Sequence, residues 1–163
     1  MEIKEEHLEE TEKQRYIDFH KEAYKEDMQL SEKLLNDFPR WSIISGYYAM
    51  HDIAKLYLGK IHLLKITGEN VHAKTLALFA KYVKADAKKA VQLLEEAKNK
   101  YDAIISSHPS ALIGLLSKGK EERGKAQYYS GADKKSSFEL LKAANYFSDN
   151  FVKPFIEIIE GML

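Results

Sequence analysis

Histidines are the residues of this chain best suited to acid–base or metal chemistry, because imidazole titrates near neutral pH and ligates metals. There are six: His7, His20, His51, His62, His72 and His108. No two form the HExxH pattern of a zincin helix, and no Glu-x-x-His pair recurs on two helices as a di-iron bundle requires. The sequence therefore gives no support to a metal site, and we expect neither a metal nor another cofactor.

Two of these histidines lie in apolar surroundings, where a structural and a functional role both have to be considered. His51 falls on an apolar helical stripe with Ile44, Tyr48 and Leu58. It is either a core histidine hydrogen-bonded to a neighbour or a group in a binding cleft. His72 opens a helical segment after a glycine-containing turn, so it either caps and packs that segment or contributes to a site.

Arg15 and His20 form an Arg-x4-His pair within the segment RYIDFH. An arginine could hold an RNA phosphate while a histidine acts as general base at the 2′-hydroxyl, which is metal-independent endoribonuclease chemistry. The chain has three arginines and six histidines, so such a spacing also arises by chance. A metal-independent endoribonuclease is therefore an alternative function.

Residues 118–135, KGKEERGKAQYYSGADKK, combine six basic and three acidic residues with two adjacent tyrosines. Arg123 next to Tyr128 could bind a phosphate and stack on a base. A solvated helix end, whose late lysines complement the helix dipole, is the other reading. The segment is a candidate contact for a nucleotide or RNA.

Several kinds of chemistry are excluded or unsupported. The absence of cysteine excludes disulfides, thiolate metal sites and a cysteine nucleophile. There is no GxGxxG or Walker sequence for phosphates and no GxSxG elbow. Lys+Arg and Asp+Glu balance at 25 each, so net charge indicates no partner. With no membrane-length apolar run and an acidic start, we expect a cytoplasmic protein that does not enter membranes.

The elements that must position these residues are helices. Few prolines, few glycines and scarce period-2 alternation divide the chain into six helical segments. They cover about 5–37, 41–64, 72–83, 86–106, a stretch after Pro109 with Ser110 as a possible N-cap, and 135–159. We predict one all-α domain, an antiparallel up-and-down bundle of five to six helices. Within it, residues 1–37 form a long N-terminal helix with a charged start and residues 38–163 form the bundle.

Apolar stripes indicate how these helices pack. In the first segment Ile17, His20, Tyr24, Met28 and Leu35 share a face, while its Glu- and Lys-rich first third is expected to project or fray. The second segment has two neighbouring stripes, which run from Trp41 to His62 and from Tyr47 to Ile61, and should be central. The last has a stripe from Phe138 to Met162, and Pro154 should kink it.

Three motifs in this order resemble those of the HEPN (higher eukaryotes and prokaryotes nucleotide-binding) family. They are SGYYAMHDIAKLYL at 45–58, VHAKTLALF at 71–79 and RGKAQYY at 123–129, and AANYF at 143–147 fits the family's ending. The likeness covers roughly residues 38–160. No histidine follows Arg123, so the chain resembles the branch that lacks the Arg-x4-6-His RNase motif at its usual position.

The resemblance implies a helical bundle, often a homodimer, that works beside a minimal nucleotidyltransferase, in a toxin–antitoxin pair, or as an RNase. We expect a non-catalytic domain that binds a nucleotide, an RNA segment or a nucleotidyltransferase. Its expected ligand-binding residues are Arg123, Tyr128, Tyr47, Tyr48, His72 and His51. Two alternatives remain: an endoribonuclease in which Arg15 and His20 meet across a dimer, and a dimerisation or interaction module built on the first and last helices.

Overall fold

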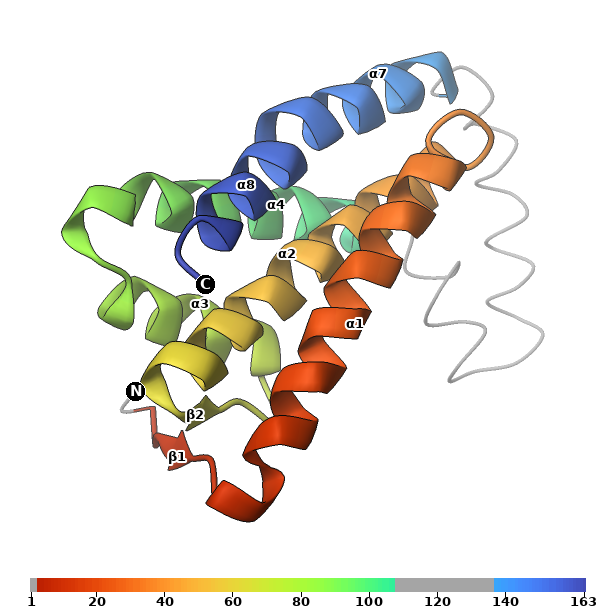
Figure 1. The fold of residues 1–163 in the computed structure, drawn as a ribbon. Helices are drawn as coiled ribbons and strands as arrows, with labels where there is room; N and C mark the ends of the chain where they lie inside the picture. Colours follow the sequence, from red (N-terminus) through yellow and green to blue (C-terminus); the bar gives the residue numbers. More distant parts are fainter. Residues whose placement is uncertain (1–2, 108–136) are drawn as a thin grey trace, which may run out of the picture.

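The chain forms helices from residue 10 onward in a computed structural model that describes residues 3–107 and 137–163 (Figure 1). In chain order the elements are β1 (Glu6–His7), α1 (Glu10–Leu34), α2 (Pro39–His62), β2 (Leu64–Lys65), α3 (Val71–Tyr82), a 3₁₀ turn (Ala85–Ala87), α4 (Lys88–Ser107), α7 (Ser137–Phe147), a π-helical turn (Ser148–Val152) and α8 (Lys153–Glu160). The predicted all-α class is confirmed. The predicted helix after Pro109 lies outside the described residues.

Helix α2 is the centre of the bundle, as its wide apolar surface predicts. It packs against α1, α3, α4, α7 and α8 (Figure 1). Most of its residues from Ser42 to Gly59 are buried. The two predicted stripes do not stay buried at their ends, since Trp41 is 38% exposed and Ile61 is 43% exposed. The apolar pattern of α2 therefore continues at both ends beyond its buried part.

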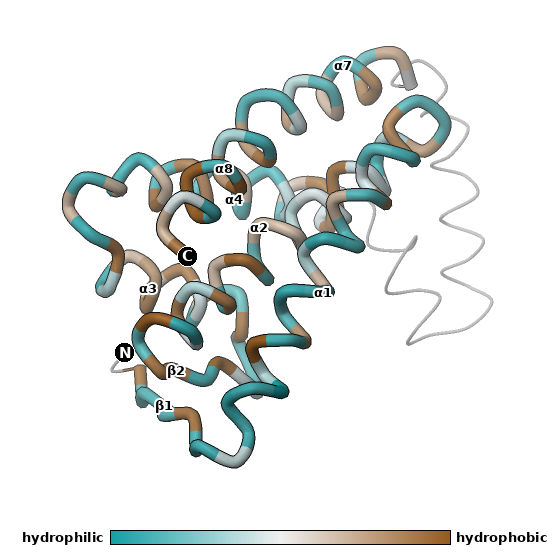
Figure 2. The backbone as a smooth tube through the Cα atoms, in the orientation of Figure 1, coloured by the Kyte–Doolittle hydropathy of each residue, from teal (hydrophilic) through white to brown (hydrophobic). Residues whose placement is uncertain are grey.

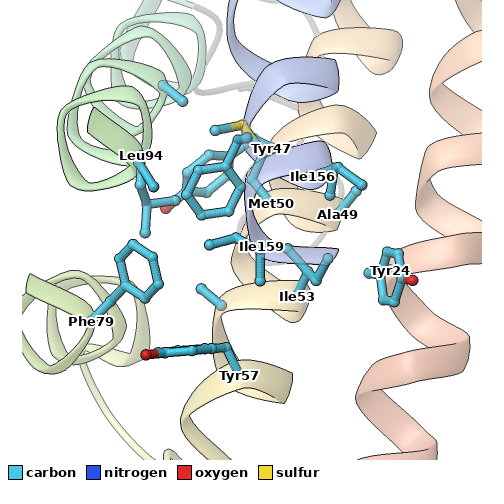
Figure 3. Close-up of a cluster of buried hydrophobic side chains, with 14 of the residues drawn as sticks. Tyr24, Tyr47, Ala49, Met50, Ile53, Tyr57, Phe79, Leu94, Ile156 and Ile159 are labelled. Carbon is cyan, nitrogen blue, oxygen red and sulfur yellow. The ribbon is translucent and has the colours of Figure 1, made fainter. Parts of the chain in front are cut away.

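The core forms around α2 from side chains of α1, α3, α4, α7 and α8. Tyr47, Met50 and Ile53 extend from α2 toward Phe79 of α3 and Ile159 of α8 (Figure 3). These five side chains are at most 1% exposed. Hydrophilic residues cover most of α1 (Figure 2), and its contribution to the core is confined to one stripe. The α1 stripe predicted from spacing is confirmed, because Tyr24 is buried and its apolar neighbours pack against the core.

Small residues allow α1 to lie close to α2. A Cβ atom on Gly59 would lie 2.8 Å from Cε1 of Tyr16, and one on Gly46 would lie 3.1 Å from Oγ of Ser31. Between the two helices, Ser31 Oγ donates to the Ser42 carbonyl and Ser42 Oγ donates to the Ser31 carbonyl, each at 2.7 Å. These buried polar contacts fix the two helices against each other without leaving the serines unsatisfied.

The Glu- and Lys-rich start of the first segment was expected to project or fray, and this prediction is wrong. Strand β1 pairs antiparallel with β2, with Glu6 opposite Lys65. Glu5 accepts hydrogen bonds from Lys81 at 2.6 Å and Tyr82 at 2.8 Å. Helix α1 then starts with a capping box at Glu9. Backbone pairing and an ion pair therefore attach this acidic segment to β2 and α3.

The last helical segment contains a π-helical turn next to its proline. Pro154 cannot donate to the carbonyl four residues earlier, and a π-helical turn over Ser148–Val152 precedes it. Phe147, Phe151 and Phe155 are buried on one face across this turn. Phe138 is 64% exposed, so its assignment to the buried stripe is wrong. Within the described residues, no helix combines the length and apolar character that a bilayer-spanning segment requires.

Candidate functional site

Five rings from three helices gather beside the core, and we call them the aromatic cluster. They are Tyr47, Tyr48 and His51 of α2, His72 of α3 and Tyr101 of α4. The Tyr47 ring is stacked on both Tyr101, with centroids 4.4 Å apart, and His72, at 5.3 Å. The rings of His51 and His72 are stacked at 4.4 Å. Tyr48, His72 and Tyr101 are partly exposed, so the cluster has a surface that a ligand can reach.

Hydrogen bonds hold the cluster together. The Tyr47 hydroxyl and Nδ1 of His72 share a hydrogen bond at 2.8 Å, and the hydroxyls of Tyr48 and Tyr101 share another at 3.2 Å. His51 is 2% exposed and bonds to the Val71 backbone, but its Nε2 has no hydrogen-bond partner among the described residues. A buried polar atom left in this way costs about 1–3 kcal/mol, a cost that a ligand or a nearby rearrangement can relieve.

The cluster is electrically neutral at pH 7. Burial, followed by the positive charge of Lys55, lowers the pKa of His51 to about 2. Burial also lowers the pKa of His72, with Lys55 and Lys98 contributing. Burial raises the pKa of Tyr47 and Tyr101 above the ordinary value for a phenol. The imidazoles and phenols therefore act as neutral hydrogen-bonding groups rather than as charges.

Lys55 supplies a positive charge next to this neutral cluster. It lies one turn after His51 on α2, is partly buried, and its pKa is lowered chiefly by burial. Among the described residues it makes no ion pair within 4.0 Å. The acid whose charge partly compensates it, Asp52, is bonded to another residue, since His20 Nδ1 donates to Asp52 Oδ1 at 2.7 Å. A partly buried ammonium without a carboxylate partner favours binding of an anion.

The structure brings together four of the six ligand-binding residues expected from sequence: Tyr47, Tyr48, His51 and His72. Arg123 and Tyr128 lie outside the described residues. Sequence reasoning missed Tyr101, because its place in the apolar stripe of α4 reads as core. It also missed Lys55, although a lysine within the most apolar helix was an available signal.

Arg15 and His20 have different surroundings. His20 is 5% exposed and bonded to Asp52, whereas Arg15 is exposed and lines a shallow hollow with Glu12, Tyr16 and Phe19. Five residues apart on a helix, the two side chains point in directions about 140° apart. They do not form a joint site within one chain, and their meeting across a dimer stays a prediction.

The carboxyl group of Asp27 on α1 should make the stability of the fold depend on pH. Burial, followed by the negative charge of Asp52, raises its pKa to about 6 from an ordinary 3.8. The folded chain thus holds this proton more tightly than the unfolded chain, so stability should fall as pH rises from about 4 to 6. Asp27→Asn should remove this dependence and raise the free energy of unfolding at pH 7 by about 1 kcal/mol, after allowance for its half-exposed position.

Urea denaturation at pH 4, 5, 6 and 7 measures the effect of Asp27→Asn. Asp37→Asn removes the same charge at an exposed position and is the control. Parallel pH profiles for the two variants would contradict the assignment to Asp27.

The described residues contain no group of three or more histidine or acidic side chains that could hold a metal ion. The arrangement instead offers stacked rings, neutral hydrogen-bonding groups and one adjacent ammonium. Comparisons with family models, curated proteins and solved structures find no match for this chain.

Proposed function

We propose that this chain is a non-catalytic domain with a HEPN-like fold that binds a nucleotide or a short RNA segment at the aromatic cluster. Two of the motifs that resemble the family support this proposal. Tyr47 comes from the first motif and His72 from the second, and their side chains share a hydrogen bond. Two residues that are 25 positions apart, one from each motif, thus belong to one cluster.

The observation that carries the proposal is the partly buried Lys55 ammonium, which has no ion-pair partner among the described residues, beside partly exposed rings. A phosphate would give this ammonium the anion that it lacks. The rings of Tyr48 and Tyr101 would stack on a base, an interaction worth about 1–3 kcal/mol per base. The neutral His72 can donate or accept a hydrogen bond at the polar edge of the base.

Binding fits the cluster better than RNA cleavage does. A general base works best when its pKa lies near the working pH. His51, with a pKa of about 2, is far from that range, and the pKa of His72 is lowered as well. We therefore expect these imidazoles to form hydrogen bonds with the ligand and not to act as general bases.

Lys55→Gln tests the proposal. Loss of a charge-assisted hydrogen bond to phosphate should weaken binding by about 1.5–3 kcal/mol, or roughly 10- to 100-fold in Kd. Fluorescence anisotropy with N-methylanthraniloyl ATP and with a fluorescein-labelled oligouridylate measures both ligand types. Lys25→Gln removes the same charge from an exposed position on α1 and should leave both affinities unchanged.

Two further variants separate the parts of the site. Tyr48→Leu should weaken binding of the base while leaving inorganic phosphate binding unchanged. Arg123→Ala tests the expectation from sequence that this arginine holds a phosphate. Wild-type protein that binds neither labelled ligand, or equal affinities for Lys55→Gln and Lys25→Gln, would refute the proposal.

A further inference from the structure

A second candidate site lies between α4 and α7, which both pack on α2 (Figure 1). It is a groove of about 480 Å³, within the range of small-molecule sites. Almost all of its wall is carbon, contributed by Ile43, Ala103, Ile104, Leu140, Ala143 and Phe147. Such a lining favours the apolar part of a ligand and offers little to hydrogen-bond the edge of a base.

Two lysines flank this groove, one from each helical wall. Lys100 of α4 has its Nζ 5.9 Å from the ring centroid of Tyr146 and 5.6 Å from that of Phe151. Lys142 of α7 has its Nζ 4.7 Å from the ring centroid of Phe138. Each ammonium group therefore lies within cation–π range of a neighbouring ring, and both lysines line the groove. Among the described residues neither lysine forms an ion pair, so both charges are available to an anion.

We propose that this groove binds a small amphipathic carboxylate with an unbranched alkyl chain, of the medium-chain fatty acid type. The alkyl chain would occupy the apolar groove, and the carboxylate would lie between Lys100 and Lys142. Charge complementarity selects an anionic head group, and the carbon lining selects an apolar tail. This site uses different side chains from the aromatic cluster, so it does not depend on the proposed nucleotide binding.

Three ligands with the same chain and different head groups test this assignment: decanoate, decanol and decyltrimethylammonium. Isothermal titration calorimetry below their micellar concentrations should rank decanoate tightest and decyltrimethylammonium weakest. The double variant Lys100→Gln/Lys142→Gln should lose roughly tenfold in affinity for decanoate and keep its affinity for decanol. Lys88→Gln/Lys89→Gln, which removes two exposed charges near the start of α4, is the matched control.

Ala143→Phe fills the groove from an exposed position and should abolish binding of decanoate and decanol. Circular dichroism verifies that this variant is folded. If the wild-type protein does not bind decanoate, the proposal is wrong. Equal affinities for decanoate and decyltrimethylammonium would also overturn it. If light scattering instead finds a dimer that Ala143→Phe dissociates, the groove is an interface between two copies and the proposal is wrong.

Discussion

Replacement of Phe155 by alanine is expected to lower the free energy of unfolding by about 3–5 kcal/mol, because it removes a large ring from a closely packed interior. Phe155 is 0% exposed, and its ring centroid lies 5.7 Å from that of Phe79. The ring joins α8 to α3, two elements that are far apart in the sequence. Urea denaturation followed by circular dichroism measures the loss.

The matched control for Phe155→Ala is Phe138→Ala in the preceding helix. It deletes the same ring at a side chain that is 64% exposed. An exposed substitution of this kind changes stability by about 0.5 kcal/mol or less. Similar losses for the two variants would contradict the assignment of Phe155 to the core.

The second large effect concerns the contact between α1 and α2 at Asp52. Its carboxylate accepts a hydrogen bond from His20 at 2.7 Å, and the two side chains are 13% and 7% exposed. Asp52→Ala leaves a buried imidazole nitrogen without its acceptor and should cost about 3 kcal/mol of stability. Asp52→Asn keeps an acceptor oxygen at the same place, so it should retain much of that stability.

Thermal and urea denaturation of both Asp52 variants test this expectation. Asp149→Ala is the control, because it breaks an ion pair with Lys153 in which both side chains are more than half exposed. Exposed pairs of this type contribute about 0.3–0.5 kcal/mol. If Asp52→Ala and Asp149→Ala lose equal stability, the contact with His20 does not stabilise the fold.

Helical periodicity predicts which side of each helix is buried, and it does so for physical reasons. The stripe on α1 and the wide apolar surface of α2 both match the observed packing. Periodicity does not say where a neighbouring helix ends. Trp41, Ile61 and Phe138 continue their stripes in sequence, yet their side chains are exposed.

Long-range pairings were the part of the fold that the sequence did not predict. Strands β1 and β2 have two residues each, which is too short for a period-2 pattern to be visible. His20 was matched with Arg15 by local spacing, whereas its partner in the structure is Asp52, 32 residues later. Such contacts depend on how helices pack, and spacing along one helix carries no information about them.

For the candidate site, the motifs of the resemblance predicted Tyr47, Tyr48 and His72, and the apolar stripe of the second helical segment made His51 a candidate. The structure adds Tyr101 and Lys55 to these four residues. Tyr101 was not predicted as a site residue, because an aromatic residue on an apolar stripe gives the same sequence pattern whether it packs in the core or lines a site. Lys55 was not predicted because isolated lysines are common on helices. Its suitability for binding an anion depends on its burial, which the sequence does not show. The expected homodimer and nucleotidyltransferase partner stay predictions from the resemblance.

The pairing of β1 with β2 has a consequence for the order in which the chain folds during synthesis. Residues 6–8 are synthesised well before residues 63–65, whose backbone groups they bind, and Glu5 is synthesised well before its partners Lys81 and Tyr82. Residues 5–8 therefore cannot take up their native contacts until the chain has been synthesised through β2 and α3. We expect their amide protons to become protected against exchange only after α2 and α3 have formed.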